Sequence, residues 1–93
     1  MEVREDKTRE FMIENNIQHE RICEELLKLD ISNYSYTEED NNKNWEGEVW
    51  IFGQIMEVRH NRFEEIYIKL KIRSNIICMS FHAKEYDLKY PYN

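Results

Sequence analysis

The chain has few cysteines and no long hydrophobic run. Its two cysteines, Cys23 and Cys78, lie far apart in the sequence, without the spacing of a disulfide framework or a metal site. A reduced, cytoplasmic protein is therefore expected. The first ten residues contain no apolar run, so no signal peptide is expected, and no stretch is long enough to span a bilayer.

The length and charge of the chain limit its class. Ninety-three residues predict a single domain over residues 1–93 with one modest core. The net charge of −6 argues against a general nucleic-acid binder. Residues 1–48 carry 6 Lys/Arg against 14 Asp/Glu, a balance of −8, whereas residues 49–93 carry 7 against 5, a balance of +2. The acidity therefore belongs to the first half of the chain, and the second half is mildly basic.

Residues 65–82 contain no glycine or proline and alternate between apolar and polar side chains. This pattern predicts two β-strands joined by a tight reversal at Ser74-Asn75. The apolar rows are Ile66, Ile68, Leu70 and Ile72 in the first strand and Ile77, Met79 and Phe81 in the second. The opposite rows are Tyr67, Lys69, Lys71 and Arg73 in the first strand and Cys78, Ser80 and His82 in the second.

The register of this hairpin follows from keeping both apolar rows on one face. A two-residue turn satisfies this condition, and it pairs Arg73 with Ile76, Lys71 with Cys78, Lys69 with Ser80, and Tyr67 with His82. The hairpin then has an apolar face and a cationic face with Tyr67 beside His82. The cationic face is either an ordinary solvated surface or a binding surface for a polyanion.

The remaining segments predict two helices and a third strand. The helices cover Lys7–Glu14 and a segment from Asn16 or Gln18 to about Lys28, and the strand covers Glu48–Glu57. Gly53 inside this strand predicts a bulge or a close backbone approach. The segments Asp30–Gly47 and Arg59–Glu64 are expected to be connections. The order predicts an α+β fold, with two N-terminal helices packed on one face of a small antiparallel sheet.

Three motifs carry a resemblance to a known family. They are GEVWIFGQI, IYIKLKI and IICMSFHAKEYDLKYPY. Together they resemble the motility quorum-sensing regulator (MqsR) family of toxins, the ribonucleases of bacterial toxin–antitoxin pairs, over roughly residues 7–92. The resemblance implies a RelE-like fold, cleavage of mRNA without a metal or cofactor, and a cognate antitoxin that binds zinc and carries a helix-turn-helix.

The resemblance also assigns site residues by position. Tyr67 and Lys69 match the family's site tyrosine and the lysine two residues later. His82 stands where the founding member has a catalytic lysine. Two positions depart from the family pattern, because Ser35 falls near a family lysine and Ile51 falls at a family glutamine.

The residue types on the cationic face suit this chemistry. Metal-independent RNA cleavage needs a base for the 2′-hydroxyl, an acid for the leaving 5′-oxygen, and cations for the phosphorane. Histidine titrates near neutral pH, so His82 can act as base or acid, and Tyr67 can hydrogen-bond the phosphate or stack on a base. Lys69 can stabilise the developing charge. The cations expected to contact RNA phosphates with it are Lys71, Arg73, Arg59, Arg62 and Lys84.

Two other functions stay open. The first is an acidic binding protein, such as a nuclease inhibitor or immunity factor, whose acidic half would occupy a basic cleft. The second is a catalytically inactive interaction module on the same fold. A metal enzyme is not expected, because the acidic cluster Glu38-Glu39-Asp40 has neither a glycine turn nor the alternating spacing of a cation loop.

Overall fold

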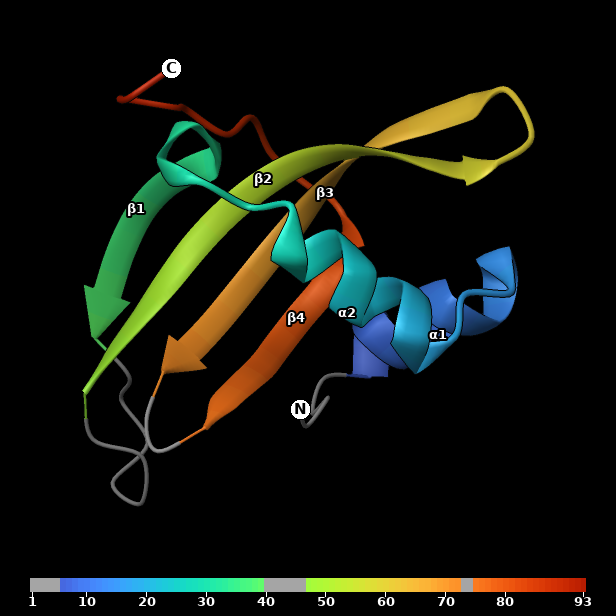
Figure 1. The fold of residues 1–93 in the computed structure, drawn as a ribbon, viewed down its shortest axis with the longest axis horizontal. Coiled ribbons are helices and arrows are strands. Elements are labelled where there is room, and N and C mark those ends of the chain that lie inside the picture. The colour runs from blue at the N-terminus through green and yellow to red at the C-terminus, as the bar shows by residue number, and fades with distance from the viewer. Residues whose placement is uncertain (1–5, 40–46, 73–74) are drawn as a thin grey trace.

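The computed structural model describes residues 6–39, 47–72 and 75–93 and has two helices followed by a four-stranded antiparallel sheet (Figure 1). The strands lie in the order β1-β2-β3-β4, so each strand pairs with its neighbour in the sequence. The α+β prediction is confirmed. The elements are α1 (Asp6–Asn15), α2 (His19–Leu27), a 3-10 turn (Ile31–Asn33), β1 (Tyr34–Glu39), β2 (Glu48–Arg59), β3 (Arg62–Ile72) and β4 (Ile76–Ala83).

Both helices cover one face of the sheet, which we call the helix face (Figure 1). Ile66 and Ile68 of β3 are fully buried there, as their alternation predicts. They pack with Phe11 of α1 and Ile22 of α2. The opposite face carries Tyr67 and is called the cleft face. No helix in the described part of the chain is long and apolar enough to cross a membrane.

A buried carboxylate joins α2 to the sheet. Glu25 is only 3% exposed, and its side chain accepts hydrogen bonds from Arg21 Nε at 3.0 Å and Lys28 Nζ at 3.3 Å. The Gln54 amide of β2 donates a third hydrogen bond to it. A buried carboxylate is tolerated only when such donors replace water. Glu25 therefore fixes where α2 lies on β2.

Strand β4 is an edge strand, and α1 shields part of its edge. The Thr8 side chain is fully buried, and its Oγ1 accepts a hydrogen bond of 2.8 Å from the backbone N–H of Phe81. This contact satisfies an edge donor that would otherwise be available to another strand. Asn16, with a φ of 52°, ends α1 in the left-handed conformation that asparagine tolerates.

Two predicted connections are wrong. Part of Asp30–Gly47 forms β1, which pairs with β2 from Tyr34 opposite Phe52 to Glu39 opposite Glu48. The expected loop Arg59–Glu64 is instead a tight turn at His60-Asn61, because β2 continues to Arg59 and β3 begins at Arg62. Asn61 has a φ of 59°, which suits a hairpin turn.

The predicted β3–β4 register is correct at one end and wrong at the other. Tyr67 lies opposite His82 and Lys69 opposite Ser80, as predicted, but Lys71 lies opposite Ile77 rather than Cys78. The register shifts between Lys69 and Leu70, so β4 contains one extra residue, Met79. This bulge turns Cys78 into the core beside Phe81, in place of the Ile77 and Met79 that the alternation predicted. The predicted pairing of Ile76 with Arg73 is also wrong, because Ile76 lies opposite Ile72. Arg73 itself lies outside the described residues.

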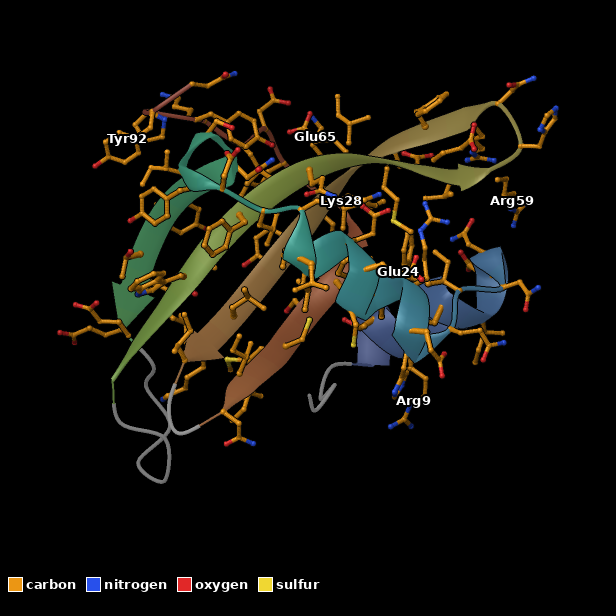
Figure 2. The ribbon with its side chains drawn as sticks, viewed as in Figure 1. Arg9, Glu24, Lys28, Arg59, Glu65 and Tyr92 are labelled. Carbon is orange, nitrogen blue, oxygen red and sulfur yellow. The ribbon has the colours of Figure 1, made fainter. Side chains whose placement is uncertain are left out.

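Replacing Glu25 by alanine should destabilise the fold. The variant leaves the Gln54 amide without its carboxylate partner at the helix–sheet junction. A cost of about 1–3 kcal/mol in the free energy of unfolding is expected, measured by urea denaturation. Glu24→Ala on the exposed side of α2 (Figure 2) is the control and should change that free energy by less than about 0.5 kcal/mol. Equal effects of the two variants would contradict a role for Glu25 in joining α2 to β2.

Candidate active site

The cleft face contains a cleft of about 390 Å³. Residues of β3, β4 and the C-terminal segment (residues 84–93) line it: Tyr67, Lys69, Met79, Ser80, His82, Glu85 and Tyr86. All three residues predicted to be catalytic, Tyr67, Lys69 and His82, are in this set. Because of the bulge, the Met79 side chain is part of the cleft wall, whereas the sequence alone placed it in the core.

Tyr67 and His82 form the floor of the cleft as a cross-strand pair. Their rings stack with centroids 5.3 Å apart and an interplanar angle of 23°. His82 is only 8% exposed, and its Nδ1 lies 2.9 Å from the carbonyl oxygen of Ala83. A carbonyl oxygen only accepts, so Nδ1 carries the hydrogen of this bond. In neutral His82 the acceptor nitrogen is therefore Nε2, and the stacking and hydrogen bond fix the orientation of the ring.

Lys69 places a positive charge in the cleft, but it forms an ion pair with a carboxylate of β1. Its Nζ lies 3.0 Å from Glu38 Oε1, and the two side chains are 26% and 41% exposed. A pair that is this accessible to water is worth less than about 1 kcal/mol. A phosphate group can therefore compete with Glu38 for Lys69 at low energetic cost.

Tyr67 of this floor meets two tyrosines from distant segments, and we call the three residues the tyrosine cluster: Tyr36 of β1, Tyr67 of β3 and Tyr86 of the C-terminal segment. The hydroxyls of Tyr36 and Tyr86 are 2.6 Å apart. The Tyr86 ring meets Tyr67 edge-on, with centroids 5.8 Å apart. Burial, together with hydrogen bonding to Tyr86, raises the pKa of Tyr36 to about 12 and the pKa of Tyr67 well above its usual range. Both phenols therefore stay protonated at neutral pH and can donate hydrogen bonds.

Glu85 is the acidic member of the cleft wall. Its carboxylate lies 2.6 Å from Lys7 Nζ of α1. The hydrogen bond from Lys7 holds the pKa of Glu85 below its ordinary value. Glu85 is therefore ionised at neutral pH, and it can accept a hydrogen bond but cannot supply a proton.

Two lysines that were predicted to contact RNA, Lys71 and Lys84, are buried or paired with carboxylates. Lys71 is on the cleft face but is only 1% exposed, so its side chain is not accessible to RNA in this structure. Lys84 lies 3.2 Å from Glu65 and 3.3 Å from Asp87, and these hydrogen bonds raise its pKa. Lys69 is therefore the one accessible cation that the described structure places in the cleft lining.

The two predicted arginine contacts lie away from the cleft. Arg59 is at the far end of the β2–β3 hairpin beside α1, where its Nε donates to Asn15 Oδ1 at 3.2 Å (Figure 2). Arg62 lies 3.3 Å from Glu64 on the same hairpin. Neither arginine lines the cleft.

The sequence missed Tyr86 and Glu85 as cleft residues, and it missed Tyr36 as the partner of Tyr86. Tyr36 lay in the stretch expected to be a connection, and Tyr86 and Glu85 lie in a segment without regular structure. The alternating tyrosines of residues 86–92 were the only signal in that segment. The departures from the family pattern, Ser35 and Ile51, are both buried and do not line the cleft.

The described residues contain no group of three or more histidine, cysteine, aspartate or glutamate side chains placed to hold a metal ion. Comparisons with family models, curated proteins and solved structures found no match to this chain. The resemblance to the toxin family therefore stays a prediction.

The tyrosine cluster should make stability depend on alkaline pH. A raised folded-state pKa contributes stability that is fully present below the unfolded tyrosine pKa of about 10. For Tyr36 this contribution is lost as the pH rises from about 10 to about 12. Urea denaturation across this range should show a smaller loss for Tyr36→Phe than for the parent protein. Ile55→Ala, an exposed change without an ionisable group, should follow the parent, and identical pH slopes for all three proteins would contradict the burial of the Tyr36 hydroxyl.

Proposed function

We propose that this chain is a metal-independent endoribonuclease of the toxin type that cleaves mRNA in the cleft. The stacked pair of Tyr67 and His82, with Lys69 in the same cleft, is the observation that carries the proposal. These three residues combine an acid–base group, an aromatic face and a cation, as RNA cleavage requires. The family resemblance supports the same function and adds a cognate antitoxin as partner, one that binds zinc and carries a helix-turn-helix.

His82 acts as the general base in this proposal. Its Nδ1 hydrogen is committed to the Ala83 carbonyl, so Nε2 takes the proton from the ribose 2′-hydroxyl. The activated oxygen attacks the adjacent phosphorus, and the 5′-oxygen of the next nucleotide leaves. The products are a 2′,3′-cyclic phosphate and a 5′-hydroxyl.

Lys69 and Tyr67 stabilise the charge that develops on the phosphate. Lys69 must exchange Glu38 for the phosphate, and its ammonium then lies beside the negative oxygens of the phosphorane. Tyr67 keeps its proton at neutral pH and donates a hydrogen bond to the same group. Glu85 is ionised, so the leaving 5′-oxygen takes its proton from water in the open cleft.

The cleft accommodates a single nucleotide rather than a duplex. Its volume of about 390 Å³ lies within the range of small-ligand pockets. Aromatic rings from Tyr67, Tyr86 and His82 offer stacking surfaces for an unpaired base. This favours single-stranded RNA, in which bases can leave the stack.

One observation favours an interaction module without catalysis as the second candidate. The predicted cations in the described structure already contact protein groups: Lys69 contacts Glu38, Lys84 contacts Glu65, and Arg62 contacts Glu64. A surface that is balanced in this way attracts a polyanion less strongly than isolated cations would. Cleavage by the purified chain separates this candidate from the enzyme.

The variant His82→Ala should lose cleavage while staying folded. Removing a positioned acid–base group costs about two to four orders of magnitude in rate. A labelled RNA oligonucleotide reports the rate, and the ends of its products report the chemistry. His19→Ala and His60→Ala are matched controls, since both histidines are exposed and outside the cleft lining. Parental activity in His82→Ala, or loss of parental activity with EDTA, would exclude this mechanism.

The ion pair between Lys69 and Glu38 gives a second test. Glu38→Gln removes the carboxylate that competes with phosphate for Lys69. RNA affinity should rise about two- to fivefold, which corresponds to the energy of an exposed ion pair. Glu39→Gln changes the net charge by the same amount one residue along β1, outside this ion pair.

A larger gain for Glu38→Gln than for Glu39→Gln supports a phosphate site at Lys69. Equal gains would show that only net charge matters and would contradict that site. Binding should also weaken with salt, because each phosphate contact releases counterions.

A further inference from the structure

The C-terminal segment, residues 84–93, crosses the cleft face without regular secondary structure (Figure 1). Glu65 of β3 accepts hydrogen bonds from two residues of this segment. The backbone N–H of Lys84 donates to the Glu65 carbonyl at 2.9 Å, and the Tyr90 hydroxyl donates to Glu65 Oε2 at 2.7 Å. Further along, the Tyr92 ring packs on Tyr34 of β1 with centroids 5.8 Å apart. Figure 2 labels Glu65 and Tyr92 near the two ends of this path.

Gly53 of β2 lies directly beneath this segment. A Cβ atom at this position would be 1.9 Å from the Tyr90 hydroxyl oxygen and 2.8 Å from Leu88 Cδ1. Gly53 does not have a positive φ, so its backbone conformation is open to any residue. Glycine is therefore required here for space, which the aromatic ring of Tyr90 occupies. The expected close approach at this glycine is made by a side chain of the C-terminal segment.

The position of Tyr90 bears on the cleft because Tyr86 precedes it by four residues in the same segment. Tyr86 supplies part of the cleft wall, contacts the Tyr67 ring, and hydrogen-bonds to Tyr36. We propose that Gly53 is a positioning residue for the cleft. Because it has no side chain, Tyr90 packs directly on β2, and we call this contact the seat of Tyr90. The seat holds Tyr86 against Tyr67. The effect on catalysis rests on the proposed ribonuclease function, whereas the seating of the segment does not.

Gly53→Ala in the full chain tests the seating by a spectroscopic signature. In the parent protein, burial raises the pKa of Tyr36 to about 12, and it also raises the pKa values of Tyr67 and Tyr90. Displacing the C-terminal segment exposes these hydroxyls and separates Tyr90 from Glu65. Absorbance of tyrosinate should therefore appear at lower pH in the variant, with up to three more tyrosines ionised by pH 11. A titration curve identical to that of the parent would overturn the proposal.

A double-mutant cycle separates seating from a general effect on the sheet. Gly53→Ala alone should lower Tm by about 5 °C or more, since Tyr90 must move. In a Tyr90→Ala background the seat is empty, and the flexible end of Leu88 can yield. There the same substitution should leave Tm unchanged or raise it, because alanine suits a strand better than glycine. Additive effects of the two substitutions would overturn the proposal.

Tyr90→Ala also keeps the test decisive if Gly53→Ala does not fold, because it empties the seat without changing β2. Its KM for an RNA oligonucleotide should rise about five- to a hundredfold, the value of one aromatic stacking contact. Its kcat should change little, since His82 and Lys69 belong to β4 and β3. Ile55→Ala, an exposed change two residues along β2, is the control and should keep the parental KM. A parental KM in Tyr90→Ala would overturn the proposal, whereas a parent without RNA cleavage would refute only the proposed function and leave the titration and Tm tests in force.

Discussion

The alternation of side chains along β3 links the helix face of the sheet to the cleft face. β3 pairs with β2 on one side and β4 on the other, and its residues Ile66 and Ile68 are fully buried against the helices. Neighbouring side chains on a strand point to opposite faces, so burial of these isoleucines fixes Tyr67 and Lys69 on the cleft face. A shift of one residue would expose the isoleucines. The hydrophobic core thus protects the geometry of the cleft.

The parts of the fold with strong periodicity could be predicted from the sequence. The two helices, the alternation in β3, and the pairing of Tyr67 with His82 all follow from residue patterns. β1 could not be predicted, because only Ser35 of its six residues is buried. An edge strand with little buried surface needs no regular apolar alternation, so its sequence resembles a connection.

The bulge and the cleft wall could not be predicted for different reasons. Ile77, Cys78 and Met79 are consecutive apolar residues, so moving the register by one exchanges one apolar side chain for another, and alternation cannot detect the change. The cleft wall depends on contacts between segments that are distant in the sequence. Tyr86 meets Tyr36, and Tyr90 occupies the space above Gly53. The glycine indicates a close approach, but no local pattern identifies the partner in either contact.

The charges of the cleft are compatible with the proposed phosphate site, although the protein is acidic, with a net charge of −6. The phenols of Tyr36 and Tyr67 stay neutral, so the charges come from Lys69 with Glu38 and from Glu85 with Lys7. Each of these pairs joins two different elements and is partly exposed to water. Binding a phosphate at Lys69 replaces one anion by another, and the lost pair with Glu38 costs less than about 1 kcal/mol. Nonspecific attraction of polyanions is therefore weak, and RNA binding as proposed would depend on the fit of the base against the aromatic rings.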